Sequence, residues 1–333
     1  MAVNLPKAKK LEQEVFAINN DETFAQIALD VFRFQYHSIP VYQQFCNQLD
    51  RTADKVKGLN EIPFLPISFF KSHKIIVYNN TVDTIFESSG TIGMTPSRHY
   101  VHKQEVYEQS FRQCFQQFYG APNQYCILGL LPSYLERGNS SLVYMVKDLI
   151  EESNHKLSGF YLHDFDQLHI TLKQLEEQNQ PTILIGVTYA LLDFAEAFPV
   201  PLKNTIIMET GGMKGRKKEL IRSEVHAILQ NAFSLEAIHS EYGMTELLSQ
   251  AYAKKEGTFF TPKWMKVFIR DEDDPLSMSN RGTGGINIID LANIYSCSFI
   301  ATEDVGKLHA DKSFEVLGRI DYSDIRGCSL LAL

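Results

Sequence analysis

Residues 182–210 read TILIGVTYALLDFAEAFPVPLKNTIIMET, and this stretch decides the fold class. Its two apolar runs, 182–188 and 204–210, have the length and character of buried strands, and a helix through Phe198 is expected between them. Buried strands separated by helices are typical of a mostly parallel sheet that helices cover on both faces. The stretch therefore predicts an α/β fold.

The same alternation extends to both sides of this stretch. Strands are expected at 124–132 and 156–162, and helices at 140–153, 166–178 and 216–230. Beyond Lys263 the segments become shorter and β-rich, with turns expected at DEDDP (271–275) and RGTGG (281–285). The C-terminal part is therefore expected to differ from the α/β core.

An N-terminal part precedes this core. Residues 10–50 are expected to be helical, with their aromatic side chains in the core, and Pro63 and Pro66 then break helicity. No long Gly/Ser linker divides the chain. We expect one large unit made of an N-terminal helical part (1–80), an α/β core (81–262) and a β-rich C-terminal part (263–333).

Composition excludes several classes of protein. The 333 residues are 44% hydrophobic and 22% charged, which is ordinary for a globular chain. The net charge of −8 and the lack of a basic block argue against a nucleic-acid partner, and no apolar run is long enough to span a membrane. An odd number of scattered cysteines without CxxC spacing predicts a reducing compartment, the cytoplasm, without disulfides or a zinc site. These cysteines are Cys46, Cys114, Cys126, Cys297 and Cys328.

Residues 87–98, ESSGTIGMTPSR, interleave small hydroxyl side chains with glycines. Such a loop lets backbone N–H groups and hydroxyls converge on one anion, and the phosphates of a nucleotide fit that description. The segment matches neither the dinucleotide fingerprint nor the P-loop. An ordinary Ser/Gly turn is the alternative interpretation. The residues expected to grip phosphate are Ser88, Ser89, Gly90, Thr91 and Gly93.

Residues 240–246, SEYGMTE, are expected to follow a strand and open a helix. Here Tyr242 can stack on a purine, Thr245 can donate to a phosphate, and Glu246 can hold Mg²⁺. A glycine turn at Gly243 between strand and helix is the alternative.

Two polar segments follow in the C-terminal part. ATEDVG (301–306) is expected to form an acidic turn between short strands, where Asp304 can accept both ribose hydroxyls. In GRIDYSDIRG (318–327), Arg319 is expected at a strand end, within reach of ribose or phosphate. The alternatives are a solvated aspartate in a hairpin and a salt-bridged surface turn.

Together, in this order and spacing, the motifs resemble the adenylate-forming superfamily of acyl- and aryl-CoA synthetases, peptide-synthetase adenylation domains and firefly luciferase. SSGTIG resembles the family's phosphate loop, EYGMTE its Tyr-Gly-x-Thr-Glu motif and Thr302 to Asp304 its ribose element. Gly211 and Gly212 fall where the family has a turn that lines the adenine and acyl pocket, and GRID resembles its hinge. The resemblance spans residues 60–330.

Within the superfamily, FLPISFFKSHK (64–74) followed by FESSGT (86–91) looks most like the fatty acyl-protein synthetase family of bacterial bioluminescence. The phenylacetate–CoA ligases are next. This resemblance implies that a carboxylic, and in particular a fatty, acid attacks the α-phosphate of ATP to give acyl-AMP, and that a thiol then takes the acyl group. The implied cofactors are ATP and Mg²⁺, with CoA as the alternative acceptor.

The resemblance also implies roles for single residues. Thr91, Thr245, Glu246 and Cys328 would be catalytic, and Glu246 would bind the metal. The nucleotide and acyl pocket would add Gly211, Gly212, Tyr242, Gly243, Asp304 and Arg319. The acceptor thiol is expected to be Cys328, because a cysteine near the C-terminus plays that part in the acyl-protein synthetases. A small buried apolar side chain is the alternative for Cys328.

The sequence departs from the family pattern at a few points. Ile92 replaces a second threonine, and Ser97 and Arg98 stand near a common lysine. The chain stops six residues after Gly327, so we expect the small mobile domain of the full-length families to be absent. The expected partners are an acid substrate and an acyl-donor, acyl-acceptor or carrier protein. The alternative functions are a ligase that uses soluble CoA and a non-catalytic nucleotide- or acyl-binding subunit.

Overall fold

The computed structural model describes residues 5–88, 95–132, 139–162, 164–211, 220–271, 274 and 276–319. Its helices are α1 (Leu5–Phe16), α2 (Asp21–Ser38), α3 (Pro40–Gln48), α4 (Phe69–Ser72), α5 (Gln104–Tyr119), α7 (Ser141–Ser153), α8 (Phe165–Glu177), α9 (Thr188–Ala197) and α10 (Arg222–Phe233). Short 3-10 turns span Leu59–Glu61 and Pro122–Gln124. Its strands are β1 (Leu65–Pro66), β2 (Thr84–Glu87), β3 (Arg98–Val101), β4 (Cys126–Leu130), β5 (Gly159–Phe160), β6 (Thr182–Val187), β7 (Thr205–Thr210), β8 (His239–Tyr242), β9 (Ala251–Ala253), β10 (Phe259–Phe260), β11 (Met265–Arg270), β12 (Met278–Ser279), β13 (Gly282–Asp290), β14 (Phe299–Leu308) and β15 (Phe314–Arg319).

One thirteen-stranded sheet runs through the described part of the chain in the order β12-β11-β13-β14-β15-β10-β9-β8-β7-β6-β4-β5, with β1 paired to β14. The strands β5, β4, β6, β7 and β8 are parallel. From β8 onward, toward β12, the neighbouring strands are antiparallel. The α/β fold and the β-rich C-terminal part are thus confirmed.

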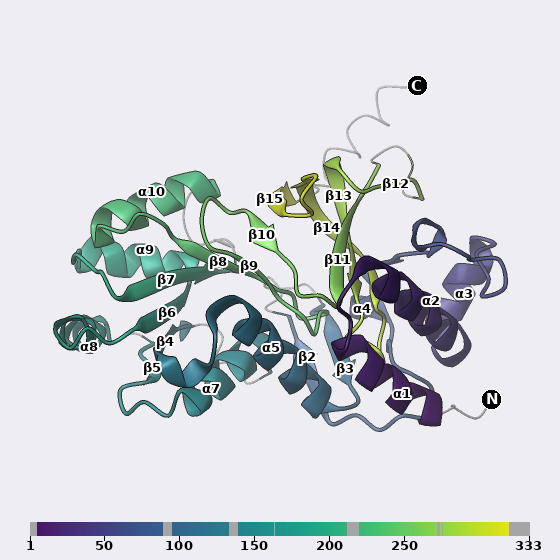
Figure 1. Cartoon of the computed structure of the whole chain (residues 1–333), viewed down its shortest axis with the longest axis horizontal. Helices are drawn as coiled ribbons and strands as arrows, with labels where there is room; N and C mark the ends of the chain where they lie inside the picture. The colour runs from purple at the N-terminus through teal and green to yellow at the C-terminus, as the bar shows by residue number, and fades with distance from the viewer. Residues whose placement is uncertain are drawn as a thin grey trace.

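Burial explains why the apolar runs became parallel strands. Every residue of β4 and β6 is buried. Figure 1 shows α9 and α10 on one face of this half of the sheet and α5 and α7 on the other. A strand with no solvated face carries no polar alternation, which is why the sequence shows continuous apolar runs there.

The N-terminal helices pack as expected. Asn20 caps α2, because its side chain accepts the backbone N–H of Thr23 at 2.8 Å. Phe24, Phe32 and Tyr42 are fully buried. The aromatic residues of this region therefore belong to the core, as the helical spacing predicts.

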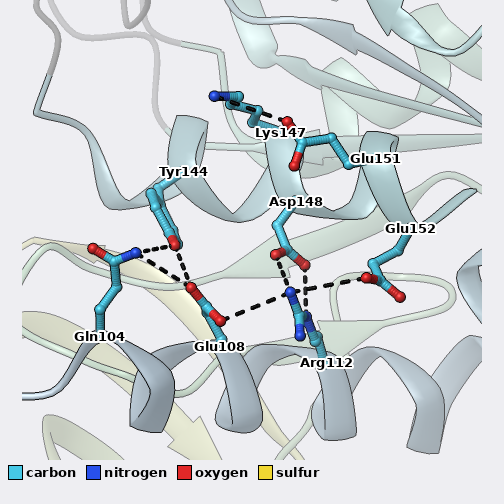
Figure 2. A network of polar contacts seen from close by, with 8 residues as sticks. All are labelled: Gln104, Glu108, Arg112, Tyr144, Lys147, Asp148, Glu151 and Glu152. Atoms are coloured by element: carbon cyan, nitrogen blue, oxygen red, sulfur yellow. Dashed lines mark hydrogen bonds and ion pairs between the residues drawn. The ribbon is translucent and has the colours of Figure 1, made fainter.

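A polar network joins α5 to α7 (Figure 2). The Arg112 guanidinium donates to both carboxylate oxygens of Asp148, with its Nε at 2.8 Å from Oδ1. One turn earlier, the Glu108 carboxylate accepts the hydroxyl of Tyr144. The ring of Tyr144 lies against Phe86 of β2 at a centroid distance of 5.9 Å. These contacts hold α5 and α7 together and pack α7 against the β2–β3 hairpin.

Several expected boundaries are wrong. The strand expected at 156–162 is only β5, because Ser158 N–H donates to the His155 carbonyl at 2.9 Å and closes a turn. The helix expected at 216–230 begins at Arg222 within the described residues, because the Glu224 carboxylate accepts the N–H of Ile221 at 3.0 Å and caps it there.

Two segments of the C-terminal part that were expected to be turns, RGTGG (281–285) and ATEDVG (301–306), lie largely or wholly in strands. RGTGG lies largely in β13, and a Cβ at Gly284 would lie 2.5 Å from the Arg270 carbonyl oxygen. Its glycines therefore serve a close approach of two strands. ATEDVG lies inside β14, which pairs with β13 on one side and β15 on the other. Its alternation of buried and half-buried residues fits a strand.

Candidate active site

A β-hairpin carries the expected phosphate loop. Strands β2 and β3 pair with Glu87 opposite Arg98. At the neck of the loop, the N–H of Ser88 donates to the Ser97 carbonyl at 3.0 Å, and the Ser88 hydroxyl accepts the N–H of Ser97 at 2.9 Å. The structure thus places Ser88 at the base of the loop. Ser89, Gly90, Thr91 and Gly93 lie outside the described residues, and their phosphate contacts stay predictions.

The chain after β8 does not open a helix, contrary to the expectation from SEYGMTE. It makes turns over residues 243–250 and returns as β9, antiparallel to β8. The buried carboxylate of Asp290 accepts the N–H groups of Leu248 and Ser249 at 2.8 and 3.0 Å. These backbone donors are satisfied by a side chain from β13, which holds the segment as a turn.

Thr245 and Glu246 lie in this turn, and their backbone carbonyls are held from two directions. The Thr245 carbonyl accepts a hydrogen bond from His99 Nδ1 at 2.8 Å. The Glu246 carbonyl accepts Asn293 Nδ2 at 2.7 Å. Glu246 is buried, Thr245 is half-buried and Gly243 is exposed.

Tyr242, Asp304 and Arg319 form a contact cluster where β8, β14 and β15 meet. The Tyr242 hydroxyl donates to Asp304 Oδ2 at 2.9 Å, and Arg319 Nε lies 3.4 Å from Asp304 Oδ1. Asp304 and Arg319 are direct partners in the β14–β15 register. The side chain of Arg319 is 61% exposed while that of Asp304 is 8% exposed, so the cluster reaches from the core to solvent.

The ring of Tyr242 is already packed by protein. It meets Phe314 edge-on at 5.5 Å and lies 5.8 Å from the Phe259 ring. Burial and the charge of Asp304 raise the pKa of the Tyr242 phenol well above its ordinary value, so the hydroxyl keeps its proton and donates. Stacking of Tyr242 on adenine stays a prediction.

Gly211 ends β7 in the left-handed region, with φ of 71°. Its carbonyl accepts the Thr188 hydroxyl at 3.0 Å, which ties the end of β7 to the start of α9. Glycine adopts this φ without strain. Gly212 lies outside the described residues.

Sequence reasoning missed two buried carboxylates beside this site. Glu209 on β7 accepts Arg222 Nε at 2.9 Å and lies 3.5 Å from His226 Nε2. Burial opposes the charge of Glu209, but His226 and Arg222 outweigh it and hold its pKa below the ordinary value. The available signal was a charged residue closing the apolar run TIIMET, which suits a buried, paired carboxylate.

The second buried carboxylate is Glu241 on β8, which accepts the Thr210 hydroxyl. Burial, together with the negative charge of Glu209, raises the pKa of Glu241 to about 7. The two neighbouring carboxylates thus differ, because the Arg222 guanidinium and the His226 ring stabilise the charged form of Glu209, whereas the Thr210 hydroxyl does not offset burial at Glu241.

Replacing Glu241 by Gln should flatten the pH dependence of folding stability. The folded-state pKa of about 7 lies above the ordinary 4.5, so the folded protein binds the extra proton and stability should fall as pH rises between these values. At pH values above 7 the stabilisation from this proton is fully lost, which lowers the free energy of unfolding by about 3 kcal/mol relative to pH values below 4.5. Urea unfolding of both proteins at about pH 5 and about pH 8 measures it. Parallel pH profiles for parent and variant would contradict the raised pKa.

The described residues contain no group of three or more His, Cys, Asp or Glu side chains arranged to hold a metal ion. Mg²⁺ does not need such a cage, because it is usually bound through one or two carboxylates together with substrate phosphates. Glu246 fits that requirement as a carboxylate in the turn next to the expected nucleotide site. Within the described part of the chain, no helix is long and apolar enough to cross a membrane.

The family model of acyl-protein synthetase LuxE matches residues 11–332. The chain belongs to the LuxE acyl-protein synthetase family. A search of curated proteins finds no match for this LuxE family member.

Solved structures share its fold. An open conformation of 2-hydroxyisobutyryl-CoA ligase, in complex with 2-HIB-AMP and CoA, has a TM-score of 0.65 at 10% identity and covers 91% of this chain and 71% of that one. ATP-bound MatB from Rhodopseudomonas palustris has a TM-score of 0.53 at 15% identity, over 72% of this chain. The match spans 48% of the MatB chain, so this LuxE family member corresponds to about half of it.

Proposed function

We propose that this chain uses ATP to activate a carboxylic acid as an acyl-adenylate and then passes the acyl group to a thiol. Membership of the acyl-protein synthetase family supports this activity. The observation that carries the proposal is the cluster of Tyr242, Asp304 and Arg319. Tyr242 directly precedes the turn that contains Thr245 and Glu246. A nucleotide carries its ribose and its phosphates on one molecule, so a site that binds it needs side chains for both groups close together.

Asp304 is the residue proposed to hold the ribose. Its side chain lies where β14 meets β15 and contacts both the Tyr242 hydroxyl and the Arg319 guanidinium. Arg319 neutralises the carboxylate and, being exposed, can also reach the ribose or a phosphate. Tyr242 donates to the other carboxylate oxygen, Oδ2, and so holds the group in place before the nucleotide binds.

Thr245 and Glu246 are proposed to serve the phosphates. The Thr245 hydroxyl would donate to the α-phosphate, and Glu246 would hold Mg²⁺. The metal would supply charge neutralisation at the phosphates. Ser88, Ser89, Gly90, Thr91 and Gly93 would bind the pyrophosphate portion of ATP. Positioning and neutralisation are the main requirements of such a transfer, so the first step needs no protein nucleophile.

The proposed reaction has two balanced steps. A carboxylate oxygen of the acid attacks the α-phosphorus, the bond to the bridging oxygen breaks, and pyrophosphate leaves with that bonding pair. A thiolate then attacks the acyl carbon, and AMP leaves. We propose a medium- or long-chain fatty acid as the substrate.

ATP–pyrophosphate exchange over a panel of carboxylic acids tests the proposal. Exchange should depend on the added acid and be fastest with medium or long apolar chains. A parallel reaction with labelled acid, with and without CoA, separates labelled protein from acyl-CoA. Rapid acyl-CoA formation without protein labelling would support the CoA ligase instead. No exchange with any acid, in a folded protein that still binds ATP, would support a binding subunit.

A further inference from the structure

His99 joins the phosphate-loop hairpin to the turn of the proposed Mg²⁺ site. It lies on β3, just after the loop, and its ring is fully buried. Its Nδ1 bonds to the Thr245 carbonyl at 2.8 Å, across 146 residues of sequence. The ring packs edge-on against Phe70 at a centroid distance of 5.7 Å. His99 therefore has a fixed position from which to hold Thr245.

Asn293 holds the next residue of the same turn. It is fully buried in the segment between β13 and β14, and its Nδ2 donates to the Glu246 carbonyl at 2.7 Å. Its own backbone is anchored, because its carbonyl accepts Gln35 Nε2 at 2.8 Å. The consecutive carbonyls of Thr245 and Glu246 thus accept hydrogen bonds from two side chains, His99 and Asn293, that come from different parts of the fold.

The remaining polar atoms of the two side chains are both acceptors. The Thr245 carbonyl oxygen can only accept a hydrogen bond, so His99 Nδ1 is the ring nitrogen that carries the hydrogen. Burial lowers the pKa of His99 to about 4, which leaves its Nε2 unprotonated at neutral pH. Asn293 commits its amide nitrogen to Glu246, so Oδ1 is the atom left over. Among the described residues, neither His99 Nε2 nor Asn293 Oδ1 has a hydrogen-bond partner.

His99 and Asn293 are among the residues that line one cavity of about 10 Å³, together with Leu248, Tyr295 and other residues of this region. A doubly protonated His99 ring could donate from Nε2 to the Asn293 side chain, which favours the charged form, but the neutral ring has no hydrogen to give there and leaves both atoms without a partner. Two acceptors cannot satisfy each other. A group that donates two hydrogens can satisfy both, and a cavity of roughly 10–15 Å³ holds one water molecule.

We propose that His99 and Asn293 are positioning residues for Thr245 and Glu246, linked by one buried water that donates to His99 Nε2 and Asn293 Oδ1. The arrangement fixes two successive peptide planes, and with them the points from which the Thr245 hydroxyl and the Glu246 carboxylate extend. It also connects the phosphate-loop hairpin to the metal-binding turn. The catalytic part of this inference rests on the proposed function, whereas the water and the imidazole tautomer do not.

Three variants test the positioning role. His99→Phe keeps the ring against Phe70 but loses the donor to Thr245, and it should lower kcat for pyrophosphate exchange roughly 10- to 100-fold, the scale of a small misplacement of reacting groups. His99→Asn retains an amide donor near the Nδ1 position and should recover most of that loss. His102→Phe is the matched control, because His102 lines the same cavity but bonds to Thr81, and it should match the parent. Parent-like kcat and Mg²⁺ dependence in a folded His99→Phe protein would overturn the role.

Two measurements on the parent do not depend on catalysis. Nitrogen-15 NMR of the histidine rings should show His99 neutral and protonated on Nδ1 down to about pH 5, and a crystal structure should show one water between Nε2 and Oδ1. An Nε2-protonated ring, or a direct His99–Asn293 hydrogen bond without water, would overturn the proposal. If the parent shows no exchange with any acid, the proposed function fails while these two results still decide the geometry.

Discussion

Replacing Glu246 by Gln should lower the rate of ATP–pyrophosphate exchange by ~10²–10³, the scale for losing one group aimed at developing charge. The same change should raise the Mg²⁺ concentration needed for half-maximal rate. Glu246 is buried in a turn whose backbone is held by His99 and Asn293, so Gln should occupy the same space without the charge. Since Mg²⁺ takes one or two carboxylates from a protein, removal of this one should weaken its binding strongly.

Two further variants separate this effect from general damage. Asp304→Asn should weaken ATP binding and raise the KM for ATP, with little change in the Mg²⁺ requirement, because Asp304 is proposed to bind the ribose. Glu256→Gln removes an exposed carboxylate in the turn between β9 and β10 and should behave as the parent. If Glu246→Gln and Asp304→Asn gave the same ATP and Mg²⁺ titrations as the parent, neither assignment would stand.

The sequence predicts the α/β fold well because the relevant signals are local. Apolar runs such as 182–188 become strands that are buried along their whole length, and the pattern says so directly. The members of the contact cluster, Tyr242, Asp304 and Arg319, could also be picked out from the sequence, because each belongs to a motif. The motifs do not show that these three side chains contact one another. Asp304 meets Arg319 because of the register of β14 against β15, and Tyr242 reaches Asp304 from β8.

The parts that sequence reasoning missed depend on contacts between distant segments. SEYGMTE was expected to open a helix, and the chain turns instead because Asp290, 42 residues beyond Leu248, accepts its backbone N–H. His99 and Asn293 reach Thr245 and Glu246 across 146 and 47 residues. An isolated His in RHYV or Asn in LANIY carries no local sign of such a role. Only the packing of β3 and the β13–β14 segment around the turn assigns it.

The described cysteines are poor candidates for the acyl acceptor. Cys46, Cys114, Cys126 and Cys297 are all buried and unpaired by disulfides. Burial raises the pKa of the Cys46 thiol to about 12 and that of Cys126 to about 11, and it raises those of Cys114 and Cys297 above the ordinary value as well. The thiolate is the nucleophile, so these four side chains are inert near neutral pH. The remaining cysteine of the sequence is Cys328, which lies outside the described residues.

Replacing Cys328 by Ser should abolish the hydroxylamine-sensitive label that ATP and radiolabelled fatty acid leave on the protein, or convert it to a hydroxylamine-resistant ester. Arg326, two residues away in the sequence, has the charge that lowers the pKa of a thiol, so we expect Cys328 to be the thiol that attacks the proposed adenylate. Pyrophosphate exchange should continue at the parent rate, because adenylation precedes thiol attack. Cys126→Ala is the control, since its thiol is buried, and it should keep the label. Thioester labelling that persisted unchanged in Cys328→Ser would rule out Cys328 as the acceptor, because the acyl group would then reside on another thiol.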